Sequence, residues 1–359
     1  MEMDRIGILT FQFAHNYGAL LQAYALKRSL TDESTSVEII NYMPIGLWEN
    51  YSINPIYAFK KRQLKKLLST PRRIKQARLF SHFQKHVLQI GEPIYRLNED
   101  AVKTYDGLIV GSDQVWSDSI LSDMSPYFFE GIESAVKLSY AASFGTDELS
   151  EVIANKIRSN LNHFRIITVR EKASVALIKA ISPDLQALHV CDPVFLLSAE
   201  TWRSVYQQHG TNNLLSDDYI LYVDLRNDPA LIQEAKKLRD KTGMKVICIH
   251  PTCWRISEDS FTQLYNVGPF EYLRLIDQAQ YVVTNSFHAV SFSMIFKKKI
   301  VHSADRKLGA RVEDLLHTFS VEGKAGCIDC CNIDVSNSEF VEQSWNILKQ
   351  MKEIIKGGV

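Results

Sequence analysis

Residues 7–26 read GILTFQFAHNYGALLQAYAL, and this stretch predicts the fold class. Residues 6–10 are an apolar run that favours a buried strand, and residues 18–30 carry apolar side chains at helical spacing. The segment between them is polar and contains His15, Asn16 and Tyr17. A buried strand followed by a polar loop and a helix is the repeating unit of parallel α/β sheets.

The same unit recurs along the whole chain. Strand-like runs in the first part lie at residues 6–10, 37–41, 107–110, 137–141, 165–169 and 189–191. A second set lies at residues 219–225, 245–250, 281–284 and 299–302, with helical patterns at 149–162, 171–181, 229–242, 269–279 and 287–296. We therefore expect an α/β protein of two Rossmann-like domains, whose parallel sheets face each other across a cleft.

The break between the two sets of strands predicts the domain boundary. We expect the first domain at residues 1–200, with a basic helical insertion near residues 46–95, and the second at residues 201–359. A linker is expected within residues 198–218, where residues 210–218 read GTNNLLSDD. Residues 338–356 have helical periodicity and predict a C-terminal helix in the second domain.

Composition excludes several classes of protein. The 359 residues hold 41 basic and 41 acidic side chains, so net charge does not indicate a nucleic-acid partner. No signal-peptide pattern opens the sequence, and no run of about 18 apolar residues predicts a membrane span. We expect a cytoplasmic protein with reduced thiols. The CxxC spacing at residues 327–331, CIDCC, lacks further ligands, so a loop is favoured over a zinc site, and no metal is expected.

Polar side chains follow most of the predicted strands. Each of them alone could be a helix cap or a turn residue. Because ligands bind beyond the carboxyl ends of parallel strands, however, their convergence on one edge of both sheets favours a site between the domains. These residues are His15, Asn16, Tyr17, Ser112, Asp113, Arg170, Glu171, Asp192, Asn285, Ser286 and His288.

Several of these segments carry a family resemblance. The motifs are GILTFQFAHNYGALLQAYAL (7–26), VEIINYMP (37–44), YDGLIVGSDQVW (105–116), KLSYAASFG (137–145), TVRE (168–171), CDPVFLL (191–197) and VVTNSFHAVSFSMIFKKKI (282–300). In this order the chain resembles the polysaccharide pyruvyl transferase family. The resemblance implies the two-domain architecture of glycosyltransferases of the B type. It also implies transfer of the pyruvyl group of phosphoenolpyruvate, a co-substrate rather than a cofactor, to a lipid-linked saccharide.

We expect catalytic roles for His288, Arg170 and Asp113, and the resemblance supports the first two. His288 begins a predicted helix and suits proton donation or phosphate binding, although a packed core histidine is the alternative. Arg170 suits the carboxylate or phosphate of phosphoenolpyruvate, and an ion pair with Glu171 or Asp192 is its alternative. Asp113 could serve as base or bind an acceptor hydroxyl, or it could cap the following segment.

Further residues are expected to bind substrate. Asn285 and Ser286 could donate hydrogen bonds to the phosphate, and Lys307 or Arg311 could close over the anion as a second cation. Ser112, Asn16 and Tyr17 are expected near the acceptor or the domain contact. Two other functions stay open: a nucleotide-sugar-dependent glycosyltransferase of polysaccharide biosynthesis, and an inactive scaffold of the assembly complex.

Residues 51–90 carry ten Lys or Arg side chains and no Asp or Glu. Apolar residues between the charges predict amphipathic helices that are interrupted near Pro71. Two interpretations explain the charges equally well. One is a solvated helical insertion. The other is peripheral contact with the anionic inner face of a membrane, where a saccharide acceptor on a lipid would lie. The side chains expected at this contact are Lys60, Lys61, Lys65 and Lys66.

Overall fold

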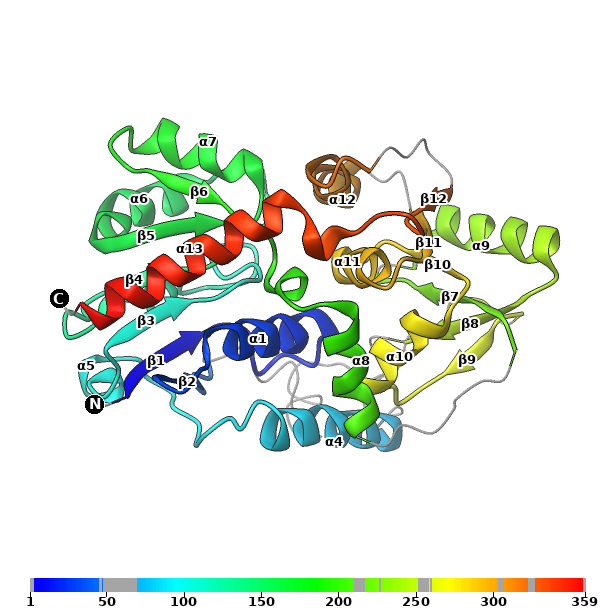
Figure 1. Ribbon diagram of the computed structural model, residues 1–359, viewed down its shortest axis with the longest axis horizontal. Coiled ribbons are helices and arrows are strands. Elements are labelled where there is room, and N and C mark those ends of the chain that lie inside the picture. Colours follow the sequence, from blue (N-terminus) through cyan, green and yellow to red (C-terminus); the bar gives the residue numbers. More distant parts are fainter. Residues whose placement is uncertain are drawn as a thin grey trace.

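Two parallel α/β sheets stand side by side in the computed structural model (Figure 1). The structure describes residues 3–44, 47, 70–146, 148–209, 217–225, 227–250, 258, 260–302, 306–321 and 327–357. The strand orders are β2-β1-β3-β4-β5-β6 and β12-β11-β10-β7-β8-β9. The prediction of two parallel-sheet α/β domains is therefore confirmed.

The first sheet is parallel throughout. Its strands are apolar because helices cover both faces, and all four residues of its third strand are buried. The strands are β1 (Asp4–Leu9), β2 (Thr35–Ile39), β3 (Gly107–Val110), β4 (Val136–Ser139), β5 (Phe164–Val169) and β6 (Ala187–His189).

The second sheet contains two short edge strands that the apolar pattern did not predict. β9 and β12 have three residues each, and β12 runs antiparallel to β11 through the CIDCC segment. The expectation of a loop there was wrong for Cys327–Asp329, since the neighbouring edge of β11 supplies the hydrogen-bond partners. The strands are β7 (Tyr219–Val223), β8 (Lys245–Ile249), β9 (Thr262–Leu264), β10 (Tyr281–Thr284), β11 (Lys299–His302) and β12 (Cys327–Asp329).

The helices begin within two residues of the predicted starts wherever a pattern was recognised. Side-chain caps explain several starts, as at Asn16, Ser150 and Asp228. The recognised helices are α1 (Tyr17–Leu30), α6 (Glu151–Asn160), α7 (Lys172–Ile181), α9 (Pro229–Thr242), α10 (Pro269–Gln278), α11 (Phe287–Ile295) and α13 (Glu339–Lys356). Helix α4 (Thr70–His86) falls within residues 51–90, where amphipathic helices interrupted near Pro71 were predicted. The others are α5 (Glu99–Val102), α8 (Ala199–Gln208), α12 (Arg306–Thr318) and the short 3₁₀ turns η2 (Ser125–Phe128), η3 (Leu161–His163), η4 (Pro193–Leu196) and η5 (Val335–Asn337).

Part of the predicted linker is helix α8. Ser198 caps this helix by accepting a hydrogen bond from the Thr201 backbone N–H. Arg203 then forms two hydrogen bonds of 2.9 Å with Asp277 of α10, and Tyr206 donates a third to the same carboxylate. The start of the expected linker is therefore an ordered helix on the second domain, because tertiary partners order a segment that is polar in sequence.

The C-terminal helix α13 returns to the first sheet (Figure 1, red). Its buried positions, Val341, Ser344, Leu348, Met351 and Ile355, recur at helical spacing and form one face. Ser344 accepts a hydrogen bond from the Cys191 backbone N–H at 3.0 Å, and Ile355 covers Gly107 of β3. The sequence prediction grouped this helix with the second domain, whereas its apolar face packs on the first.

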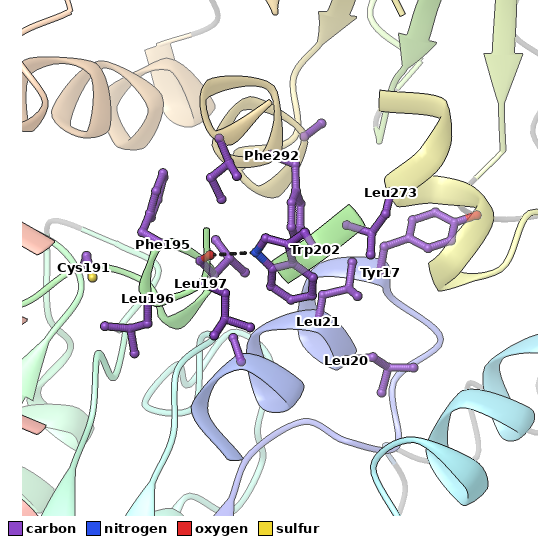
Figure 2. Close-up of a cluster of buried hydrophobic side chains, with 14 of the residues drawn as sticks. Tyr17, Leu20, Leu21, Cys191, Phe195, Leu196, Leu197, Trp202, Leu273 and Phe292 are labelled. Carbon is purple, nitrogen blue, oxygen red and sulfur yellow. Dashed lines mark hydrogen bonds between the residues drawn. The ribbon is translucent and has the colours of Figure 1, made fainter. Parts of the chain in front are cut away.

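A continuous apolar core joins the two domains (Figure 2). Tyr17, Leu20 and Leu21 of α1 approach Leu273 of α10 and Phe292 of α11, with Phe195 to Leu197 and Trp202 between them. The Trp202 indole N–H donates to the Val194 carbonyl at 3.0 Å. Because an extensive apolar contact disfavours relative domain motion, this core holds the facing edges of the two sheets in register.

Helix α4 also bridges the domains (Figure 1, lower edge). Gln84 donates to the Gln12 carbonyl in the first domain, while Gln76 donates to the His250 carbonyl in the second. The helix begins at Thr70, so Pro71 lies in its first turn, where proline is tolerated. Lys60, Lys61, Lys65 and Lys66 lie outside the described residues. Among the described helices, none combines the length and apolar character needed to cross a membrane.

Candidate active site

His288 lies in the first turn of α11, directly beyond β10. Ser286 caps this helix by accepting a hydrogen bond from the Ala289 backbone N–H. Asn285 is held on both sides, because its Nδ2 donates to Asp224 at 2.7 Å and its Oδ1 accepts from the Leu225 N–H at 2.9 Å. These bonds set the start of α11, and they leave the His288 side chain directed toward the first domain.

Arg170 follows β5 in the first domain, and its side chain is 3% exposed. Its Nε donates to Glu171 Oε1 at 3.1 Å, and its Nη1 donates to Asp192 Oδ2 at 3.1 Å. The guanidinium carbon lies 4.6 Å from the centre of the Phe287 ring, which comes from the second domain. The ion pairs considered as an alternative from the sequence are therefore present, and they place Arg170 beside α11.

Asp192 connects these groups, although the sequence analysis gave it no catalytic role. Its Oδ2 accepts from Ser112 Oγ at 3.0 Å and from Arg170, and it lies 3.4 Å from His288 Nε2. Its Oδ1 accepts from the Val194 N–H. One fully buried carboxylate thus joins residues that follow β3, β5, β6 and β10, so His288, Arg170 and Ser112 are brought together across the domain boundary.

The electrostatics of this cluster follow from its charges. Burial by itself would raise the pKa of the Asp192 carboxyl, but the charges of His288 and Arg170 overcome it and hold that pKa well below its usual range. Burial likewise opposes the charged form of Arg170, yet Glu171, Asp192 and Asp113 raise its pKa further. Asp192 is therefore an anion and Arg170 a cation at neutral pH.

Two polar atoms in the cluster are buried without a hydrogen bond. They are Glu171 Oε2 and His288 Nε2. His288 Nε2 lies 3.4 Å from Asp192 Oδ2, but this contact is not an aligned hydrogen bond. Since buried polar atoms are normally satisfied, both atoms have capacity for a ligand. The hydrogen bonds of Arg170 to Glu171 and Asp192 use its Nε and Nη1.

Gly18 of α1 lies directly against the imidazole of His288. A methyl group built at Gly18 would stand 2.0 Å from His288 Nδ1 and 2.3 Å from its Cγ. No side chain other than hydrogen fits there while the ring keeps its place. Gly18, the glycine of the first βα unit, is therefore needed for the close approach of the second domain. The sequence motif alone gave no reason for a glycine at this position.

Asp113 lies at the same edge but is bound locally. Its backbone has φ +86°, and its Oδ1 accepts a hydrogen bond from the Gln114 N–H at 2.9 Å. The carboxylate is close enough to Arg170 to raise the pKa of the guanidinium. The structure thus combines the turn role considered from the sequence with a position near the cluster.

The remaining predicted residues differ in their surroundings. Asn16 is exposed and caps α1 through bonds from the Gly18 and Ala19 N–H groups. Tyr17 is buried in the domain contact, stacked on Tyr272 at 4.3 Å, with its hydroxyl donating to the Val267 carbonyl. Arg311 is half-buried on α12, and Lys307 lies on the same helix with a side chain outside the described part. Helix α12 borders the site, since Asp314 accepts a bond from the Lys172 N–H.

Replacing Asp192 with asparagine should lower the free energy of unfolding at pH 7 by about 3 kcal/mol. This value is the lower end of the range for a broken buried ion pair, because Arg170 keeps its ion pair with Glu171. The native pKa of Asp192 is depressed, so its stabilisation is complete above the ordinary value of 3.8 and is lost as pH falls below it. Urea unfolding at several pH values should show the two proteins converging in acid. A gap independent of pH would mean that the carboxylate charge is not the stabilising feature.

Comparison with known proteins gives the family of this chain. A family model described as polysaccharide pyruvyl transferase matches residues 16–304. The chain belongs to the polysaccharide pyruvyl transferase family. The match covers both domains and includes Gly18, Arg170, Asp192 and His288. No curated relative matches the sequence of this family member.

Solved structures show what the family fold is similar to. A UDP-GlcNAc 2-epimerase of Methanocaldococcus jannaschii, in complex with UDP-GlcNAc and UDP, aligns with a TM-score of 0.50 at 13% identity, covering 98% of this chain and 100% of its own. A putative UDP-N-acetylglucosamine 2-epimerase of Listeria monocytogenes aligns with a TM-score of 0.51 at 9% identity, covering 100% and 98%. At these identities the likeness concerns the fold of two parallel-sheet domains.

Proposed function

We propose that this protein transfers the pyruvyl group of phosphoenolpyruvate to two hydroxyls of a sugar in a polysaccharide precursor, forming a ketal. The observation that supports it most is the Ser112–Asp192–Arg170 cluster facing His288, inside a chain of the pyruvyl transferase family. The cluster offers a buried cation and a histidine beside a fixed anion, at the edge where ligands bind in parallel sheets.

The reaction needs a proton on the methylene carbon of phosphoenolpyruvate. His288 would donate it from Nε2, the buried atom without a hydrogen bond, and Asp192 would stabilise the protonated ring beforehand. One sugar hydroxyl then adds to the neighbouring carbon, and its proton returns to His288. Phosphate leaves with the proton of the second hydroxyl, which closes the ketal ring, so atoms and charges balance.

Arg170 would hold the anion of phosphoenolpyruvate through Nη2 while its other nitrogens remain paired with Glu171 and Asp192. Two carboxylates already neutralise this cation, so a second positive group is required. Arg311 or Lys307 on α12 would supply it. Ser286 would contribute a hydrogen bond, whereas Asn285 would act by orienting the start of α11.

Asp113 would accept a proton from, or orient, the acceptor hydroxyl. Asn16 is exposed and could contact the acceptor sugar, while Tyr17 would act through the domain contact. We keep the proposal of a lipid-linked saccharide acceptor at the inner face of a membrane, which salt-sensitive binding of the full chain to anionic vesicles would support.

The decisive test is product formation. The protein should release phosphate from phosphoenolpyruvate only when a suitable lipid-linked saccharide is present, and mass spectrometry should show a ketal on that saccharide. The alternative is a nucleotide-sugar-dependent glycosyltransferase, in line with the UDP bound by the Methanocaldococcus epimerase. Sugar transfer from a nucleotide sugar, with no consumption of phosphoenolpyruvate, would establish that alternative instead.

Replacing Arg170 with alanine should weaken phosphoenolpyruvate binding by on the order of 1.5–3 kcal/mol, the value of a lost charge-assisted contact. Isothermal titration with phosphoenolpyruvate measures the effect directly. Arg165→Ala is a matched control, because Arg165 lies on the same strand β5 with an exposed side chain. Equal affinity of the wild type and the Arg170 variant, when both are folded, would refute the role.

A further inference from the structure

A cavity of about 700 Å³ lies in the first domain. Three segments form it: residues that follow β2, residues 95–97, and residues 120–130 after β3. Two of these segments follow strands of the first sheet at their carboxyl ends. The cavity therefore opens at the same edge of the sheet as Ser112 and Asp113, but neither Arg170 nor His288 lines it.

The walls of this cavity combine aromatic rings with hydrogen-bonding groups. Tyr42 and Tyr95 supply the rings, and Tyr95 is 54% exposed, which is unusual for a large aromatic side chain. Arg96, Ser122 and Asp123 supply donors and acceptors around them. A ligand that fits must have an apolar face for the rings and many hydroxyls for the polar groups, and sugar rings have both.

Charge narrows the class of ligand further. The described residues that line the cavity include one cation, Arg96, and two carboxylates, Asp123 and Glu130. Glu130 is already paired with Lys156, whereas Asp123 accepts a hydrogen bond from the Ser125 N–H and is exposed. Because Glu130 is paired, Arg96 and Asp123 offset each other among these residues. A lining without net positive charge disfavours a nucleotide or another phosphorylated ligand, so a neutral saccharide is the class that fits.

Tyr127 connects the cavity to the catalytic edge. Its ring packs edge-on against Tyr42 at 6.0 Å and against Phe11 at 5.4 Å. Burial raises the pKa of the Tyr127 hydroxyl, and the nearby charges of Tyr42 and Asp113 raise it further. Tyr127 therefore contacts Tyr42 of the cavity wall and lies near enough to Asp113 to be affected by its charge.

We propose that the cavity is a subsite for a neutral saccharide, namely the part of the acceptor chain next to the sugar that receives the pyruvyl group. The role of the cavity as an acceptor subsite rests on the proposed function, whereas the binding of a saccharide in the cavity does not. The subsite recognises the acceptor through Tyr95, Arg96 and Asp123, and it lengthens the acceptor contact without touching the reacting atoms.

Binding to an array of neutral and anionic bacterial glycans tests the subsite without any turnover. The wild type should bind neutral glycans, and Tyr95→Ala and Arg96→Ala should each weaken the best of these at least about tenfold, as expected for a lost stacking or bidentate contact. Leu188→Ala is the control, because Leu188 is exposed (41%) but lies on β6, away from the cavity. The proposal would be overturned if the wild type bound no neutral glycan, if the variants bound as tightly as the wild type, or if anionic glycans were preferred.

Kinetics separate this proposal from the proposed function. With oligosaccharide acceptors, Tyr95→Ala should raise KM for the acceptor and leave kcat unchanged, while a monosaccharide acceptor should show no effect. Glycan binding that depends on Tyr95 without any pyruvyl transfer would retain the subsite and refute the proposed function. Pyruvyl transfer with an acceptor KM that Tyr95→Ala does not change would retain the proposed function and refute the subsite.

Discussion

Replacing His288 with alanine should lower pyruvyl transfer by roughly two to four powers of ten, the usual contribution of a general acid. The imidazole is 12% exposed, starts α11 and stands 3.4 Å from the buried Asp192 carboxylate. Without the imidazole, no group donates a proton to the methylene carbon of phosphoenolpyruvate. The cation at Arg170, which holds the anion, stays in place. Phosphoenolpyruvate affinity should therefore change far less than kcat.

Single-turnover measurement of ketal formation, with thermal unfolding to verify the fold, checks this expectation. His163→Ala serves as the control, since His163 is an exposed histidine of the first domain. A well-folded His288 variant with activity near that of the wild type would exclude His288 from proton transfer. In that case the chemistry would depend on Asp113 or on a group outside the described residues.

Replacing Gly18 with alanine should also cut activity strongly, by about a hundredfold, because small displacements of a catalytic group are costly. The added methyl group would stand 2.0 Å from His288 Nδ1, so the ring must leave its position or the domains must separate locally. Gly91→Ala is a matched control, since nothing lies within 4 Å of a methyl group at that glycine. Gly91→Ala should behave like the wild type.

A double-mutant cycle makes this expectation specific. The three atoms nearest to the added methyl group all belong to the His288 ring. In a His288→Ala background, Gly18→Ala should therefore cost little further stability and no further activity. Full additivity of the two substitutions would show that Gly18 acts on something other than the position of the imidazole.

Much of the fold was predictable from local pattern. β3, β10 and β11 begin and end at the predicted residues, and α9 spans its predicted range, because apolar strands and capped amphipathic helices are set by neighbouring residues. The short edge strands β9 and β12 were not predictable. Three residues hold too little periodicity, and their hydrogen bonds come from a neighbouring strand that local sequence does not reveal.

The candidate site shows the same division. His288, Arg170 and Ser112 could be selected from the sequence because each follows a strand, and the carboxyl ends of parallel strands meet at one edge. Asp192 was visible only as a possible ion-pair partner of Arg170. Its contacts with Ser112, Arg170 and His288 join positions separated by 80, 22 and 96 residues (192 − 112, 192 − 170 and 288 − 192), so no local pattern carries them.

The sequence alone therefore determined most strands of the two sheets, most of the helices between them and the set of polar residues that follow them. Those features depend on side-chain burial within a few residues. Only the tertiary structure decided that α13 returns to the first sheet, that Asp192 is shared by two domains and that Gly18 makes room for His288. These depend on close packing between distant segments, where a single methyl group or carboxylate determines which arrangement fits.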